Sequence, residues 1–219
     1  DRYDDILQVG QDGHVRKFGS RRHYCYTSAS YRAETERIVT LLAETFGSHE
    51  ALGAWQTDNE YGCHGTVRCY CRNCEAAFRG WLEARYGDIN ALNEAWWNVF
   101  WSMEYCDFSE IDLPNLTVTE ANPSHSLDFC RFSSDAVVAY NKLQVDILRR
   151  HSSQPVSHNA MLYFGDYDAF RLAEDLDLLT WDSYPLGMLE QSPLPDAVKA
   201  HYLRVGHPDL VSLMHDLYY

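Results

Sequence analysis

Three short apolar segments separated by stretches of helical periodicity constrain the fold of this chain more than any other feature. The segments are Leu52–Tyr61, Pro155–Met161 and Asp177–Tyr184. Single strands that alternate with helices predict βα units around a parallel sheet, and therefore an α/β fold. Three strands are too few to close a barrel, so we expect the chain to supply only part of a larger sheet.

Apolar stripes predict the helices between these segments. Ile38, Leu41, Leu42 and Phe46 recur at helical spacing before Gly47, which is typical of an amphipathic helix and its C-terminal stop. The expected elements are helices over Ser30–Phe46, Glu75–Tyr86, Asp88–Trp96, Ser126–Arg150, Asp168–Glu174, Pro195–Val205 and Asp209–Tyr218, with long loops over Asp1–Tyr26 and Ser102–Pro123.

A polar cluster ends each of the three apolar segments. The clusters are Asp58–Glu60, Ser157–Asn159 and Asp182–Tyr184. A (β/α)8 barrel places its active site at the C-terminal ends of its strands. The pattern therefore predicts the central part of a (β/α)8 TIM barrel, incomplete at both ends, with residues 1–219 forming part of a single catalytic domain. A start at Asp1 without a methionine fits an internal piece of a longer protein.

The charge balance and the missing motifs argue against several classes of function. The chain has 18 Lys and Arg residues against 32 Asp and Glu residues, a formal charge of −14. Nucleic-acid binding needs a basic surface, so we expect no nucleic-acid partner. No apolar run approaches the roughly 20 residues of a membrane helix, so we expect no membrane association. Glycine-rich phosphate loops and the H-E-x-x-H and G-x-S-x-G motifs are also missing.

Glu60 is the first candidate for catalysis. It ends a predicted strand between Trp55 and Tyr61, and a carboxyl group walled by aromatic rings loses solvation, which favours its neutral form. Such a group can protonate a leaving-group oxygen and later act as a base. The neighbouring Asn59 amide could bind a sugar hydroxyl. An exposed glutamate that merely closes a strand explains the same residues equally well.

Seven cysteines form an odd number, which argues against a fully paired secreted framework and favours a cytoplasmic protein. Cys69, Cys71 and Cys74 lie within six residues and provide three of the four ligands of a structural zinc site. Coincidental buried thiols are the alternative. Spacing leaves the fourth ligand open among Cys25, Cys63, His64, Cys106 and Cys130.

Several motifs resemble glycoside hydrolase family 42, a family of β-galactosidases. They are Phe18–Cys25, Trp55–His64 with its Asn-Glu-Tyr-Gly-Cys-His run, Ser157–Asn159 and Trp181–Pro185. The resemblance implies a (β/α)8 barrel that cleaves terminal β-galactosides with retention and assembles as a homotrimer. It makes Glu60 the general acid/base and places the nucleophilic glutamate beyond the C-terminus of this chain.

The resemblance also implies roles for individual residues. Arg21 matches an arginine that holds the nucleophile and substrate, and Asn59 matches an asparagine that binds the sugar. Trp101 and Tyr184 match aromatic residues of the sugar subsite, although ordinary core packing is the more frequent fate of such residues. Cys25 matches the fourth ligand of a structural Zn²⁺ site. The same chemistry on β-L-arabinopyranosides or β-D-fucosides, or a zinc-stabilised carbohydrate-binding fragment without turnover, remain alternatives.

Overall fold

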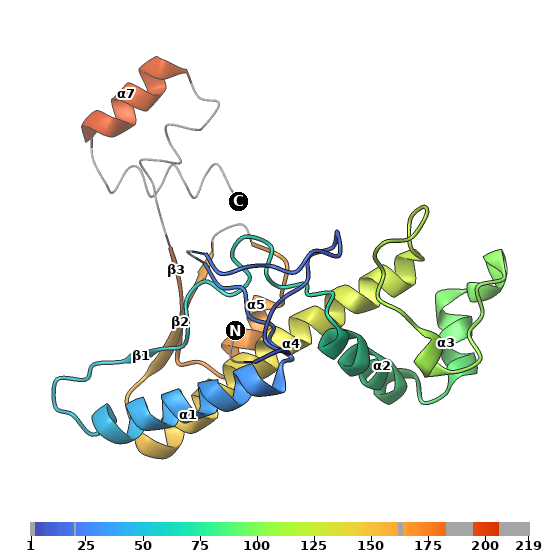
Figure 1. Cartoon of the computed structure of the whole chain (residues 1–219). Helices are drawn as coiled ribbons and strands as arrows, with labels where there is room; N and C mark the ends of the chain where they lie inside the picture. Colours follow the sequence, from blue (N-terminus) through green and yellow to red (C-terminus); the bar gives the residue numbers. More distant parts are fainter. Residues whose placement is uncertain (1–2, 20, 162–163, 183–194, 206–219) are drawn as a thin grey trace. The chain divides into compact units, whose positions relative to one another are not determined.

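The computed structural model describes residues 3–19, 21–161, 164–182 and 195–205 (Figure 1). The chain divides into two compact units, Asp1–Thr180 and Trp181–Tyr219. The first unit contains the helices and strands that surround Glu60. The second contains helix α7 (Asp196–Val205), which confirms the helix predicted over Pro195–Val205. The helix predicted over Asp209–Tyr218 lies outside the described residues.

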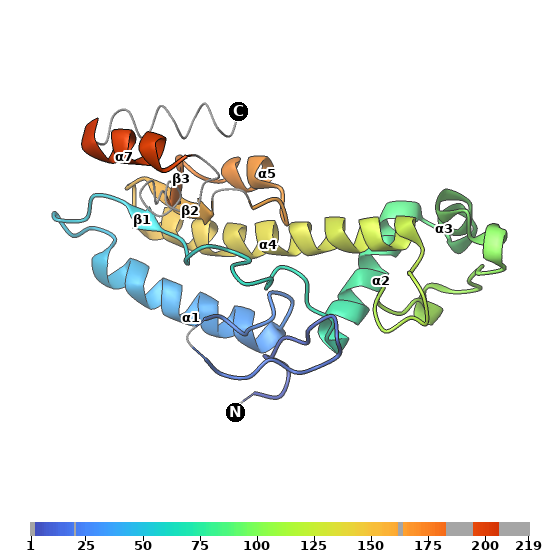
Figure 2. The same cartoon turned by 90° about the horizontal axis from the view of Figure 1, so that it is seen from above.

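Two long helices, α1 (Ala29–Phe46) and α4 (Pro123–His151), pack against each other along the first unit (Figures 1 and 2). The Ser28 hydroxyl caps α1 by accepting from the Tyr31 amide. Helix α4 begins three residues before the predicted Ser126, because Asn122 caps it and a proline at the first position suits a helix start.

The apolar stripe predicted for α1 is present, but it does not form the buried face of the helix. The residues of this stripe, Ile38, Leu41, Leu42 and Phe46, are all exposed. The buried residues of α1 are Thr35 and Ala43 instead. This helix therefore has an uncovered apolar side within the part of the chain that the structure describes.

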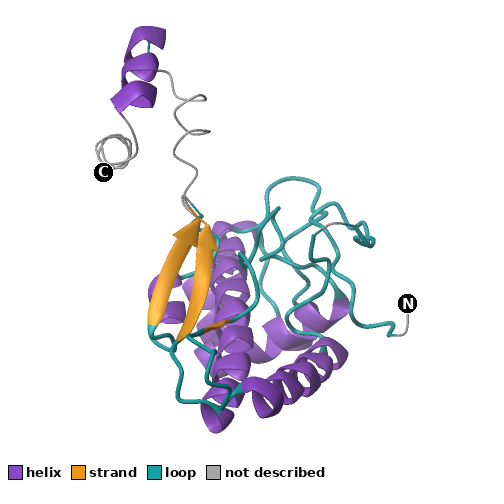
Figure 3. Cartoon of the chain, turned by 90° about the vertical axis from the view of Figure 1, so that its left-hand side faces the viewer, coloured by secondary structure: helices purple, strands orange, loops and turns teal. Residues whose placement is uncertain are grey.

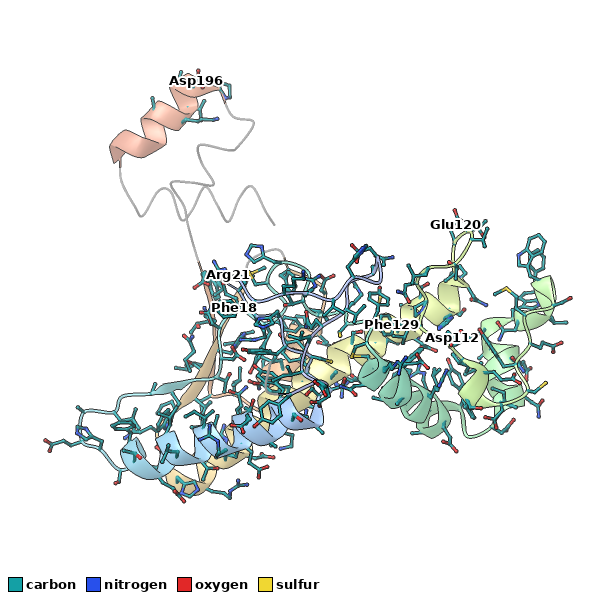
Figure 4. All side chains as sticks on the ribbon, viewed as in Figure 1. Phe18, Arg21, Asp112, Glu120, Phe129 and Asp196 are labelled. Atoms are coloured by element: carbon teal, nitrogen blue, oxygen red, sulfur yellow. The ribbon has the colours of Figure 1, made fainter. Side chains whose placement is uncertain are left out.

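Helices α2 (Arg72–Tyr86) and α3 (Ile89–Trp96) confirm two further predictions and pack on the N-terminal half of α4. Two short 3₁₀ helices, η1 (Asn98–Trp101) and η2 (Phe108–Glu110), interrupt the long loop that leads to α4. The core between these elements is aromatic: Phe129, labelled in Figure 4, meets Phe78 edge to face with ring centres 5.4 Å apart. Aromatic pairs prefer this geometry.

The sheet has three strands in the order β1–β2–β3, consisting of β1 (Trp55–Gln56), β2 (Val156–Met161) and β3 (Leu178–Asp182). Strands β1 and β2 are parallel, with Trp55 opposite Val156. The arrows of β2 and β3 also point the same way in Figure 3. The short helix α5 (Ala169–Ala173) connects β2 to β3. This arrangement is an α/β fold with a parallel sheet, as predicted.

The first strand is much shorter than the predicted Leu52–Tyr61. The Thr57 amide still bonds the Ser157 carbonyl oxygen of β2 at 2.9 Å, but Asp58 and Glu60 adopt positive φ angles of 42° and 43°. Residues other than glycine rarely adopt such φ angles, and a β-strand cannot continue through a residue that does. The chain therefore leaves the sheet at Asp58, two residues before Glu60.

The N-terminal stretch is a long loop, as predicted, with isolated antiparallel bridges between Leu7 and Tyr24 and between Val9 and Val15. Its backbone also bonds the cysteine-rich segment, since the Tyr70 amide donates to the Val9 carbonyl oxygen at 2.9 Å. Among the described residues, no helix combines the length and the apolar character needed to cross a membrane.

Candidate active site and metal site

Glu60 lies in a turn at the C-terminal end of β1, and side chains from elsewhere hold the backbone of this turn. The Glu60 amide donates to Asn159 Oδ1 at 3.3 Å, and the Tyr61 amide donates to His158 Nε2 at 3.4 Å. The next amide, that of Gly62, donates to the Tyr26 hydroxyl at 3.3 Å. Strand β2 and the N-terminal loop thus fix the conformation of the turn together.

His158 is held by backbone groups at both ring nitrogens. Its Nδ1 lies 2.8 Å from the Thr57 carbonyl oxygen, which can only accept, while Nε2 faces the Tyr61 amide, which can only donate. The ring therefore carries a hydrogen on Nδ1. It is fully buried and stacks on the Tyr61 ring, with centres 4.1 Å apart. Through these contacts the His158 side chain of β2 stabilises the conformation of the turn.

Gly62 is required by the shape of this turn. Its φ is +81°, and a Cβ atom there would lie 2.3 Å from Val67 Cγ2 and 2.7 Å from the Phe164 ring. A side chain would therefore force both neighbours to move in addition to adopting an unfavourable backbone conformation.

The Glu60 carboxylate is mostly shielded and has two polar partners. Its side chain is 13% exposed, and Oε2 lies 3.3 Å from Arg21 Nη1 and accepts from Asn59 Nδ2 at 3.1 Å. Asn159 Nδ2 in turn donates to Asn59 Oδ1 at 3.0 Å. Arg21 comes from the N-terminal loop beside the ends of the strands (Figure 4). The structure thus brings together Glu60, Arg21 and Asn59, all singled out from the sequence.

The aromatic wall expected around Glu60 is not formed by its neighbours in sequence. Trp55 packs on the cluster around Val145 and Val156, and Tyr61 is buried in a separate cluster with Tyr26 and Tyr140. The described surroundings of the carboxylate are consequently polar.

A mostly buried ion pair close to the turn was not anticipated. Arg22 pairs with Asp58, and its guanidinium lies 5.8 Å from the centre of the Tyr26 ring and 5.9 Å from that of Tyr61. Cation–π contacts of this kind are favourable, particularly where water is excluded. The polar cluster after the strand hinted at Asp58, but no local pattern distinguishes Arg22 from Arg21.

Four cysteines meet in a second cluster, as the sequence and the family resemblance together predict. The Sγ atoms of Cys25, Cys69, Cys71 and Cys74 all lie within 4.8 Å of one another, and these residues could hold a metal ion. Cys25 comes from the N-terminal loop and lies 3.4 Å from Cys74 through their sulfur atoms. Cys63, Cys106 and Cys130 are free thiols outside this cluster.

The donor set fits a closed metal site. Hydrogen bonds from the thiols of Cys25, Cys69 and Cys74 hold the pKa of Cys71 well below its usual range, so the cluster favours at least one thiolate. The Val9 amide donates to Cys69 Sγ at 3.4 Å, the kind of outer contact that orients a metal ligand. Four sulfur ligands leave no open coordination position, which is typical of a structural metal.

Of the aromatic residues carried over from the resemblance, Trp101 ends η1 and is 74% exposed. It lines a cavity of about 1070 Å³ together with Phe100 of η1 and with Trp96 and Trp97, which precede η1. Tyr184, like Ser183, lies outside the described residues. Asp182 ends β3, as predicted.

The comparisons with known proteins agree with the resemblance seen in the sequence. A family model described as "Beta-galactosidase", glycoside hydrolase family 42, matches residues 1–219. A β-galactosidase from Thermus thermophilus is 60% identical over the whole chain, which covers 34% of that protein. Curated relatives such as this one are therefore about three times as long as the chain.

Two solved structures are similar over almost the whole chain. The β-galactosidase of the psychrophilic Marinomonas ef1 is 56% identical with a TM-score of 0.89, and the chain covers 33% of it. That of the Antarctic haloarchaeon Halorubrum lacusprofundi is 48% identical with a TM-score of 0.87, and the chain covers 32% of it. Here 99% and 98% of the present chain are aligned. The chain belongs to glycoside hydrolase family 42, the family of the β-galactosidases.

Proposed function

We propose that the full-length protein is a retaining β-galactosidase that hydrolyses terminal, non-reducing β-D-galactosides, with Glu60 as its general acid/base. The chain then supplies the central part of a (β/α)8 barrel, within a single catalytic domain that extends beyond residues 1–219. The uncovered apolar side of α1 supports a larger barrel, because neighbouring elements would bury it.

The observation that carries this proposal is the Glu60 carboxylate, held beside Arg21 and Asn59 at the C-terminal ends of parallel strands. That is where barrels of this class place their chemistry. Protonated Glu60 would donate its proton to the glycosidic oxygen as the bond to the leaving group breaks, and the resulting carboxylate would then take a proton from the attacking water. Asn59 would orient a sugar hydroxyl through its side-chain amide.

The second carboxylate of the reaction would lie outside this chain. Retaining glycosidases hold their two carboxyl groups about 5–5.5 Å apart. A glutamate at the end of a later strand, beyond residue 219, would attack the anomeric carbon. Arg21 is suited to hold both carboxylates, since a guanidinium offers five N–H donors in a planar fork.

The four-cysteine cluster would bind a structural Zn²⁺ ion that takes no part in the reaction. Cys25 lies four residues after Arg21 in the sequence, and Cys69, Cys71 and Cys74 come after the Glu60 turn. The ion would therefore tie together the two segments that carry Arg21 and Glu60, and would add to the stability of the site.

We also propose a cytoplasmic homotrimer. The exposed aromatic residues of η1 support a subunit interface, because large exposed apolar patches commonly mark contact surfaces. The odd number of cysteines and the free thiols support a reducing compartment.

The test uses Glu60→Gln in the full-length protein, with Glu44→Gln, an exposed glutamate on α1, as the matched control. Glu60→Gln should lose at least a hundredfold in kcat on substrates with poor leaving groups. With activated aryl galactosides, the rate of the first step, in which the leaving group departs, should fall far less. Azide should restore turnover and yield a β-galactosyl azide, because a small anionic nucleophile needs no general base.

Full turnover of poor substrates by Glu60→Gln would refute the assignment of Glu60. A wild-type protein that binds β-galactosides without cleaving them would favour a carbohydrate-binding fragment instead. β-L-Arabinopyranosides and β-D-fucosides belong in the substrate panel, since they share the axial hydroxyl of galactose; a preference for either would change the substrate and leave the mechanism intact.

A further inference from the structure

Arg22 contacts both ends of the turn that carries Glu60. At the start of the turn, its guanidinium pairs with the Asp58 carboxylate. At the end, its Nη1 donates to the Tyr26 hydroxyl at 3.2 Å, and the same hydroxyl accepts from the Gly62 amide at 3.3 Å. A hydroxyl oxygen has two lone pairs, so it can accept both bonds. Glu60 lies midway between the two points that Arg22 holds.

The Asp58 carboxylate connects Arg22 to the backbone next to Glu60. Its Oδ1, which faces the Arg22 guanidinium, also accepts from the Asn59 amide at 2.7 Å. Asp58 has a φ of +42°, and an aspartate adopts such an angle more readily than most residues because its short side chain can bond the backbone locally. The aspartate therefore shapes the turn and also anchors it to Arg22.

The Arg22–Asp58 pair is largely shielded from water. The Arg22 side chain is 18% exposed and the Asp58 side chain 11% exposed. Exposed ion pairs contribute little to stability, whereas removal of one partner of a buried pair leaves the other charge buried without compensation. The pair therefore constrains the two segments that it joins much more strongly than an ion pair on the surface would.

Arg21, the preceding residue, contacts the other carboxylate of the turn. Its Nη1 lies 3.3 Å from Glu60 Oε2, but its side chain is 55% exposed. A long exposed side chain has many accessible conformations, so its position depends on how firmly its backbone is held. The Arg22–Asp58 pair holds that backbone one residue away. Adjacent arginines thus contact two carboxylates of one turn, Arg21 that of Glu60 and Arg22 that of Asp58.

We propose that Arg22 is a positioning residue whose ion pair with Asp58 holds the loop of Arg21 against the turn of Glu60, and so sets the direction of the Glu60 carboxyl group. This inference rests on the proposed function, because it takes Glu60 to be the acid that protonates the leaving group. A displaced acid slows the departure of a poor leaving group most, since an activated aryl leaving group needs little protonation. A displacement of about 1 Å can cost roughly a hundredfold in rate.

The experiment compares Arg22→Met, Asp58→Asn and the double variant with the wild type in the full-length protein. Arg22→Met removes the charge and keeps an unbranched apolar side chain, and Asp58→Asn keeps the shape and the acceptor for the Asn59 amide. The control is Arg37→Met, which makes the same change at an exposed arginine that pairs with Glu34 on α1. The readout is the ratio of kcat/KM for an alkyl β-galactoside to kcat/KM for a dinitrophenyl β-galactoside. Both values report the first step of the reaction.

Arg22→Met and Asp58→Asn should each lower this ratio by roughly tenfold or more, because kcat/KM falls far more for the alkyl substrate than for the activated one. The double variant should lower the ratio about as much as either single variant, since both changes break one interaction. Arg37→Met should leave the ratio unchanged. A packing defect that does not displace Glu60 would lower the unfolding temperature without changing the ratio.

A wild-type ratio in Arg22→Met would overturn the inference, even if that variant is less stable. If Arg22→Met does not fold, Asp58→Asn decides in the same way. Losses that multiply in the double variant would also overturn it, because the two residues would then act separately. The Glu60→Gln experiment separates the two claims. Retained turnover of poor substrates there refutes the proposed function and this inference together, whereas azide rescue there with a wild-type ratio in Arg22→Met refutes only the role of Arg22.

Discussion

Asn159 Nδ2 donates a hydrogen bond of 3.0 Å to Asn59 Oδ1, linking strand β2 to the turn that follows the neighbouring parallel strand β1. The Oδ1 atom of the same Asn159 accepts from the Glu60 amide. A single β2 side chain therefore orients the amide of Asn59 and fixes the backbone that carries Glu60.

Asn159→Ala should lower kcat of the full-length protein by roughly ten- to a hundredfold, because two hydrogen bonds of about 1 kcal/mol each position the reacting residues. Ser157→Ala is the matched control. Ser157 lies two residues earlier on β2 and bonds the Trp55 carbonyl oxygen at 3.0 Å, upstream of the Glu60 turn. It should lose about 1 kcal/mol of stability and little activity. Equal losses of kcat in both variants would contradict the positioning role of Asn159.

Gly62→Ala should destabilise the full-length protein by about 2–4 kcal/mol, from the positive φ and the clash with Val67 and Phe164 together. Thermal unfolding measures the effect. Gly80→Ala is the control, because Gly80 is exposed within α2 with open space around its Cα, and an alanine there should stabilise by about 0.5–1 kcal/mol. A Gly62→Ala variant as stable as the wild type would mean that the turn has a different conformation.

Removal of the metal should destabilise the protein without changing the reaction that the remaining folded molecules perform. We expect one equivalent of zinc per chain by elemental analysis, and Cys25→Ser should reduce both the zinc content and the unfolding temperature. Acid should release the ion as well, since protons compete for the thiolates. Cys106→Ser, which changes an exposed thiol outside the cluster, should alter neither quantity. Zinc content unchanged in Cys25→Ser would rule out this ligand.

The helices could be predicted from the sequence because their signals are local. The Asp88 carboxylate caps α3 by accepting from the Asn90 and Ala91 amides, within three residues of its own position. The same reasoning misplaced the start of α4, since Asn122 and Pro123 were assigned to the preceding loop. The exposed stripe on α1 shows a second limit: periodicity identifies an apolar side but not whether anything covers it.

The site was only partly predictable because its contacts span long stretches of sequence. Three cysteines within six residues indicated the four-cysteine cluster, but Cys25 lies 44 residues before Cys69, and only the family resemblance selected it. Asn159 and His158 support the Glu60 turn from about 100 residues away. No periodicity encodes such pairings; they follow from the register of β1 on β2, which local patterns do not determine.

His125 should make the protein sensitive to mild acid. It lies between the rings of Trp96, 4.7 Å away by ring centres, and Phe78, 5.7 Å away, and burial lowers its pKa to about 4. In the unfolded chain His125 becomes protonated near pH 6.5, whereas in the folded protein it becomes protonated only near pH 4. The corresponding stability is fully present above pH 6.5, and up to about 3 kcal/mol of it is lost as the pH falls toward 4.

His125→Phe keeps an aromatic ring in this position and removes the titrating group. The difference in unfolding temperature between pH 7 and pH 4 should therefore be smaller in His125→Phe than in the wild type, as measured by thermal unfolding of the full-length protein. His14→Phe is the matched control, because it makes the same change at a histidine whose side chain is exposed. If the unfolding temperature of His125→Phe falls as much between pH 7 and pH 4 as that of the wild type, His125 does not cause the acid sensitivity. An equal reduction in His14→Phe would point instead to the overall charge of the chain.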